Sequence, residues 1–110
     1  MIELRQQFRI PVDMQVVFAH AGATNLKEGT LFDLSTGGCA VATTVAVPSG
    51  VPLSLLIEGG DLGTPIRIPT ATVRWTKLGE FGVEFLALPE LERRRLYRLI
   101  QYLRPTWTTG

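Results

Sequence analysis

The sequence predicts an all-β domain followed by one helix, folded as a small antiparallel barrel or sandwich. Three observations favour this fold class. Six short apolar runs are separated by turn residues at fairly even spacing, which is typical of small barrels and sandwiches. The 110 residues include 11 glycines and 7 prolines, enough to supply many turns. Near the end of the chain, the apolar spacing changes from that of strands to that of a helix.

The first three runs lie in the N-terminal half. Residues 14–19 are rich in valine and phenylalanine, as β-strands often are. Residues 29–35 lead through Thr36, Gly37 and Gly38 into residues 39–43. Two β-prone runs separated by such a short glycine-rich segment indicate two strands joined by a tight turn.

The next three runs, at 52–58, 66–76 and 81–85, show the alternation of half-buried strands. The glycine-rich segment 59–63 is expected to form a turn between the first two. The residues expected to face the core are Leu53, Leu55 and Ile57, then Ala71, Val73 and Trp75, then Phe81, Val83 and Phe85.

Residues 89–104 are predicted to form a helix, which Pro105 ends. Pro89 suits a first helical turn, and acidic residues at 90 and 92 complement its positive end. The residues at helical spacing that should pack against the barrel are Leu96, Leu99, Ile100 and Leu103. The expected organisation is an N-terminal segment at 1–12, a barrel at 13–88, the helix at 89–104 and a tail at 105–110. With Met1 at its start, the chain is expected to be a single-domain protein.

Charge and cysteine content exclude several classes of function. The formal net charge is +1, too small for the chain to hold a polyanion by bulk attraction. The single cysteine, Cys39, excludes an intramolecular disulfide and a cysteine-rich zinc site. No apolar run approaches the ~20 residues of a membrane span, and the N-terminus lacks the apolar core of a signal peptide. We therefore expect a cytoplasmic protein with no membrane span and no metal.

Catalytic residues are poorly represented, so we expect a protein that is not an enzyme. His20 is the only histidine, and no second ligand lies at metal-binding spacing from it. His20, Asp33 and Ser35 are the types found in a nucleophilic triad, but a chain of this size contains such a trio by chance. Cys39 is expected to be a small buried side chain.

Two short motifs point instead to ligand binding. Arg5 and Arg9 are four residues apart, a spacing that keeps both guanidinium groups on one side of an extended segment. Each can pair bidentately with phosphate or with a guanine edge. Asp33 and Ser35 would emerge on one face of a strand, where a carboxylate can accept hydrogen bonds from guanine. Gly38 would leave room beneath a docked ligand.

Together, the motifs RxxxR and [D/N]xSxxG at this separation resemble those of the PilZ domain, a bacterial receptor module for cyclic di-GMP. The resemblance extends over nearly the whole chain, through 9–12, 73–75 and 82–85 to the helix after Pro89. It implies a six-stranded antiparallel β-barrel. It also implies a regulatory protein of second-messenger signalling with cyclic di-GMP as its ligand and no further cofactor.

The resemblance also implies the binding site. Arg5 and Arg9 would clamp guanine and phosphate groups, while Asp33 and Ser35 on the barrel surface receive a guanine. Gly38 would keep the turn open. Further candidates are Gly37, Arg74 and Leu4; because position 4 is leucine and not another arginine, one nucleotide per site is favoured.

The expected mechanism is a non-catalytic switch. The N-terminal segment would be mobile without nucleotide and would fold against the barrel with it, exposing a new surface to an effector protein. Two alternatives stay open. One is a protein-interaction barrel without nucleotide binding, with Arg94, Arg95 and Arg98 as a docking face. The other is an OB-like binder of single-stranded nucleic acid; it is less favoured because strand cations are few and Trp75 should face inward, so neither DNA nor RNA is expected as a partner.

Overall fold

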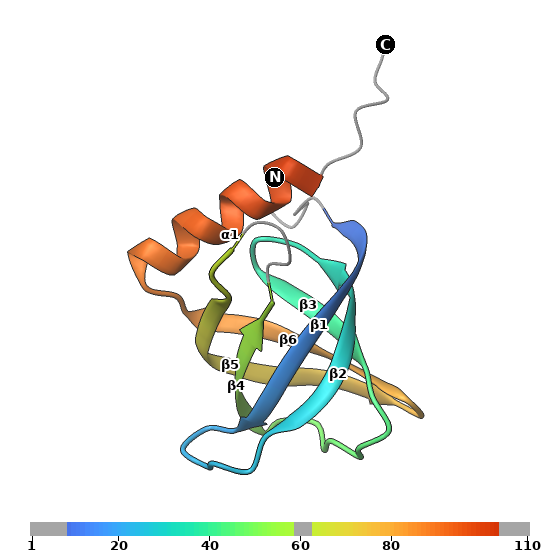
Figure 1. The fold of residues 1–110 in the computed structure, drawn as a ribbon. Helices are drawn as coiled ribbons and strands as arrows, with labels where there is room; N and C mark the ends of the chain where they lie inside the picture. The colour runs from blue at the N-terminus through green and yellow to red at the C-terminus, as the bar shows by residue number, and fades with distance from the viewer. Residues whose placement is uncertain (1–8, 59–62, 104–110) are drawn as a thin grey trace, which may run out of the picture.

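In the computed structural model, which describes residues 9–58 and 63–103, six antiparallel strands form a barrel and one helix follows them (Figure 1). The elements are β1 (Ile10–His20), β2 (Lys27–Leu34), β3 (Gly38–Ala42), β4 (Pro52–Ile57), β5 (Ile66–Lys77), β6 (Glu80–Ala87) and α1 (Glu90–Leu103). The sequence prediction of six strands and a C-terminal helix is confirmed. The predicted turn at 59–63 lies almost wholly outside the described residues.

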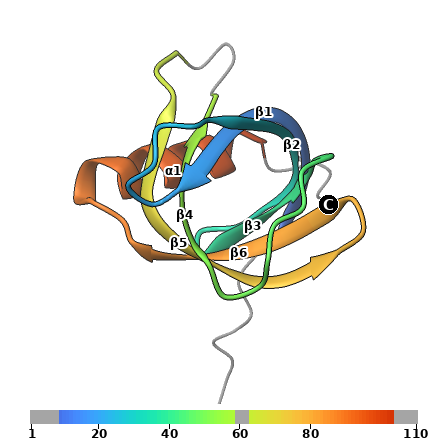
Figure 2. The same ribbon diagram turned by 90° about the horizontal axis from the view of Figure 1, so that it is seen from below.

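The strands close into a barrel in the order β1-β2-β3-β6-β5-β4. Each neighbouring pair is antiparallel, including the closing pair β1–β4, in which Val16 to His20 face Ile57 to Leu53. A sandwich is therefore ruled out in favour of the barrel. Figure 2, a view from below, shows the strands arranged around the interior, and in both views the β5–β6 hairpin reaches beyond the barrel wall.

Alternating apolar side chains fill the interior, as strand periodicity requires. The rings of Phe18 and Phe81 meet edge to face in this core, with centroids 5.1 Å apart and planes at 69°. The largest fully buried side chains around them come from strands β1 to β5 and from the helix: Ile10, Leu31, Leu34, Leu53, Ile57, Ile68, Leu96, Val16, Val41 and Val73.

β1 begins four residues before the predicted run at 14–19. Ile10 pairs with Leu34 and Pro11 with Asp33, and Ile10 is buried in the core. Pro11 has no N–H to donate, and strands accept proline at their first residues or beside irregularities. It is the second residue of β1, next to a register shift between Pro11 and Met14. The strand therefore places Arg9 directly beside the end of β2.

The prediction that Trp75 faces the core is wrong. The pairing of β5 with β6 shifts register between Val73 and Trp75. Because one inserted residue reverses the alternation, Val73 is buried while Trp75 is 36% exposed. Phe85 is also only half-buried, packed against the edge of the core.

Helix α1 lies across one end of the barrel, against β5 and β1 (Figure 1). Its buried residues Leu96, Leu99 and Ile100 have the predicted spacing. The backbone N–H of Arg67 donates to Glu92 Oε1 at 3.1 Å, tying the first turn of α1 to β5. No helix among the described residues is long and apolar enough to cross a membrane.

Candidate functional site

A groove of about 400 Å³ lies where the start of β1 and the β2–β3 turn meet strands β5 and β6. Its lining consists of Arg9, Gly37, Gly38, Cys39, Arg74, Trp75, Gly82, Val83, Glu84 and Phe85. Four residues singled out from the sequence (Arg9, Gly37, Gly38 and Arg74) are among them, and Asp33 contacts one of these. Arg5 and Leu4 lie outside the described residues.

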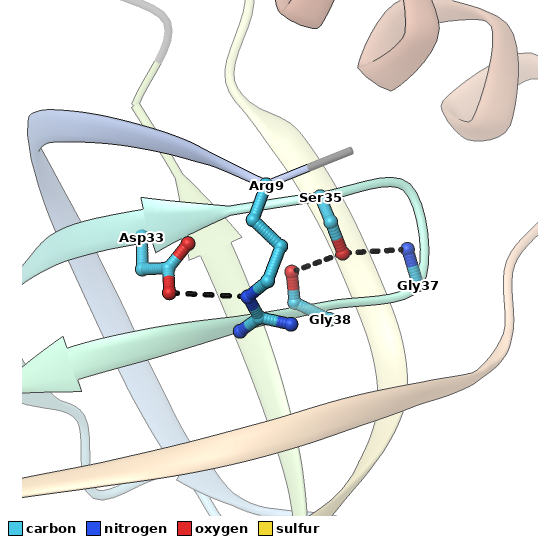
Figure 3. Close-up of polar contacts among 5 residues, drawn as sticks. All are labelled: Arg9, Asp33, Ser35, Gly37 and Gly38. Atoms are coloured by element: carbon cyan, nitrogen blue, oxygen red, sulfur yellow. Dashed lines mark hydrogen bonds and ion pairs between the residues drawn. The ribbon is translucent and has the colours of Figure 1, made fainter. Parts of the chain in front are cut away.

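Arg9 and Asp33 join the two sequence motifs directly (Figure 3). The Nε–H of Arg9 donates to Asp33 Oδ2 at 3.2 Å, across a sequence separation of 24 residues. The pairing of Pro11 with Asp33 explains the contact, because it sets the residue before β1 beside the end of β2. The two side chains are 50% and 31% exposed, so a ligand can reach both.

Ser35 differs from its expected position on the barrel surface. β2 ends at Leu34, and Ser35 starts the turn with its side chain fully buried. Its hydroxyl accepts from the backbone N–H of Gly37 at 3.1 Å and donates to the carbonyl of Gly38 at 3.3 Å (Figure 3). Its own N–H donates to the same carbonyl at 2.9 Å. In this conformation, Ser35 fixes the turn beside Asp33.

Gly38 is required by strand packing. A Cβ atom on Gly38 would lie 2.3 Å from the backbone oxygen of Val83 on β6, far inside contact distance. Gly37 completes the same junction, because its carbonyl accepts a hydrogen bond from the N–H of Phe85 at 2.9 Å. The two glycines therefore hold the β2–β3 turn tightly against β6, at the floor of the groove.

Trp75 is the groove residue that sequence reasoning missed. Its indole ring lies over Gly82, where a Cβ would come within 2.2 Å of Nε1. The side chain of Lys77 sits above the ring, with Nζ 5.4 Å from the centroid. A glycine inside a strand often marks such a close approach, so Gly82 within Phe81-Gly82-Val83 was the available signal.

Charges in the described part of the groove balance. Arg9 is paired with Asp33, and Arg74 on β5 is paired with Glu84 on β6. The site thus presents individual guanidinium groups against carboxylates and no broad positive field. Such an arrangement suits a compact anion bound by directed hydrogen bonds.

Cys39 lies under the groove as the small buried side chain that was expected. Burial raises the pKa of its thiol far above the ordinary value, and the neighbouring carboxylate of Asp33 raises it further. The thiol therefore stays protonated and is a poor nucleophile.

The geometry excludes the histidine triad. His20 is nine positions along β1 from Pro11, the partner of Asp33, which is about 30 Å at ~3.3 Å per residue. Among the described residues, no three histidine, cysteine or acidic side chains cluster as metal ligands.

The sequence of this chain matches the model of a known protein family. A family model described as the PilZ domain matches residues 3–102. Among curated proteins, none matches this chain significantly.

Solved structures share the fold. The PilZ domain with c-di-GMP of YcgR from Escherichia coli superposes with a TM-score of 0.72 at 19% identity, over 92% of each chain. The PilZ domain of CeSA from a cellulose-synthesizing bacterium gives 0.70 at 21% identity, over 87% of this chain and 97% of that one. The Bacillus subtilis inhibitor of motility MotI/DgrA gives 0.71 at 20% identity over 92% of this chain, which spans about half (52%) of that protein.

Proposed function

The chain belongs to the PilZ domain family, and from this premise we propose that it is a non-catalytic receptor for cyclic di-GMP. The observation that carries the proposal is the contact between Arg9 and Asp33. It brings together the RxxxR and DxSxxG motifs at the rim of a groove. The presence of c-di-GMP in the related YcgR domain structure agrees with this ligand.

Arg9 and Asp33 would exchange partners when the nucleotide binds. The Asp33 carboxylate can accept hydrogen bonds from the N1–H and N2–H₂ donors of guanine. Arg9 uses only Nε in its present contact, and its two terminal nitrogens have no partner among the described residues. They can therefore bind a phosphate as a planar fork while guanine takes over the carboxylate.

Other residues contribute to the site in different ways. We assign Arg5 as the second guanidinium of the motif, by its position four residues before Arg9. Ser35 and Gly38 set the shape of the turn that presents Asp33. The partly exposed ring of Trp75 lies in the same groove, and a guanine can stack on it once the Lys77 side chain moves off the ring. With Leu4 in place of a further arginine, we expect one nucleotide per chain.

The output of the receptor would be a changed surface that an effector protein reads. A bound nucleotide covers the groove and adds its own polar face to the barrel. We expect the protein to act in the cytoplasm and to signal without chemistry of its own.

Isothermal titration with cyclic di-GMP tests the proposal. We expect saturable heat with one nucleotide per chain, lost in Arg9→Ala and in Arg5→Ala. Arg93→Ala is the matched control, because it removes an exposed arginine on α1 outside the groove and should bind like the wild type.

The titration also separates the alternatives. No heat at tens of micromolar nucleotide would leave a protein-interaction barrel as the better explanation. Binding of a single-stranded oligonucleotide that vanishes with added salt would favour the OB-like alternative.

A further inference from the structure

Arg74 and Glu84 form a second ion pair at the groove. The Nε–H of Arg74 donates to Glu84 Oε1 at 2.7 Å, and Nη2 of the same arginine contacts that oxygen as well. Both residues line the groove that also contains Arg9 and Trp75. Two of its cations are thus each held by a carboxylate of the protein itself.

A ligand can displace Glu84 from Arg74 at little cost in stability. The side chains are 57% and 50% exposed, and exposed ion pairs contribute little to stability. A phosphate offers Arg74 several acceptor oxygens that match the guanidinium fork. Glu84, by contrast, would face the phosphate as a like charge and weaken its binding.

We propose that Glu84 is an internal competitor of the ligand phosphate, and that Arg74 moves from Glu84 to the nucleotide as an additional phosphate-binding residue. This inference rests on the proposed function. It assigns to the pair a role in setting affinity: the carboxylate reduces binding at low nucleotide concentration, and the ligand must displace it.

Affinity measurements on three variants test the competition. Arg74→Ala should weaken cyclic di-GMP binding about tenfold, the effect of losing one charge-assisted hydrogen bond. Glu84→Gln should tighten it about threefold, because it frees Arg74 and removes the repulsion. Glu90→Gln removes the same charge from an exposed Arg–Glu pair on α1, outside the groove, and should leave affinity unchanged.

Tightening by Glu84→Gln and Glu90→Gln alike would overturn the inference, since it would indicate a general effect of net charge. An unchanged affinity in Arg74→Ala would overturn it too. Melting temperatures close to that of the wild type would establish that each variant is folded.

Nuclear magnetic resonance of the arginine Nε–H groups provides a direct readout. During titration with cyclic di-GMP, the Arg74 signal should move together with that of Arg9, whereas the Arg93 signal should stay. If Arg9 moves and Arg74 does not, the inference fails while the receptor function stands. If the wild type shows neither heat nor any shift, both fail.

Discussion

Replacing Gly38 by alanine should destabilise the barrel. The added Cβ would lie 2.3 Å from the Val83 carbonyl oxygen, a backbone atom that can yield only if β3 and β6 separate. Overpacking of this kind costs about 1–3 kcal/mol. The lower conformational entropy of the unfolded alanine chain opposes that cost, because it favours the folded variant by about 0.4–1 kcal/mol. The net loss should therefore be about 1–2 kcal/mol, or roughly 5–15 °C in melting temperature for a domain of this size.

Gly82→Ala is the matched comparison. Its Cβ would meet the indole ring of Trp75, a partly exposed side chain that can swing away, so the loss of stability should be smaller. Thermal unfolding followed by circular dichroism measures both variants. Trp75 fluorescence, recorded in a Trp107→Phe background, should change in Gly82→Ala. A Gly38→Ala protein that melts like the wild type yet loses nucleotide binding would refute the packing argument and restore ligand access as the reason for this glycine.

Three further outcomes follow from burial and charge. Cys39 should resist a thiol reagent at pH 8 in the folded protein and react once the protein is denatured. Because burial raises the pKa of this thiol, the stability contributed by the protonated Cys39 is complete below the ordinary thiol value of 9.0 and decreases as the pH rises above it. Leu96→Ala should lower the free energy of unfolding in urea by about 2–5 kcal/mol, since this fully buried side chain anchors α1; a loss below 1 kcal/mol would contradict that anchoring. Asp33→Asn should change the melting temperature by less than about 5 °C, because the exposed ion pair with Arg9 contributes at most ~1 kcal/mol to stability. A larger drop in melting temperature would indicate that Asp33 has a structural role.

Much of the fold was predictable because its strands alternate and its helix has a clear apolar stripe. The spacing of Leu96, Leu99 and Ile100 predicted the face of α1 that is buried. The closure of β1 onto β4 was not predictable from strand patterns alone. These strands are not consecutive in the chain, and their pairing is made by backbone hydrogen bonds, which do not depend on particular side chains. The resemblance to a known family supplied it.

Predictions about the site depended on whether a residue keeps its strand register. The resemblance assigned Arg9 and Asp33 to one site, and the structure places their side chains in contact. Ser35 and Trp75 did not follow the simple alternation, because one begins a turn and the other follows a bulge. An inserted residue shifts pairing without any distinctive side chain, so alternation assigned Trp75 to the wrong face.

The bulge in β5 has a consequence for how this domain can vary. Every residue from Arg74 to Gly79 is exposed, so the outer part of the β5–β6 hairpin is released from the packing constraints that govern Val73 and the strand before it. Substitutions there can alter the groove wall and the projecting tip without repacking the core. Related chains could therefore acquire different ligand affinities or partners on an unchanged barrel. A relative that lacks the residue inserted between Val73 and Trp75 would place the corresponding aromatic ring in the barrel core.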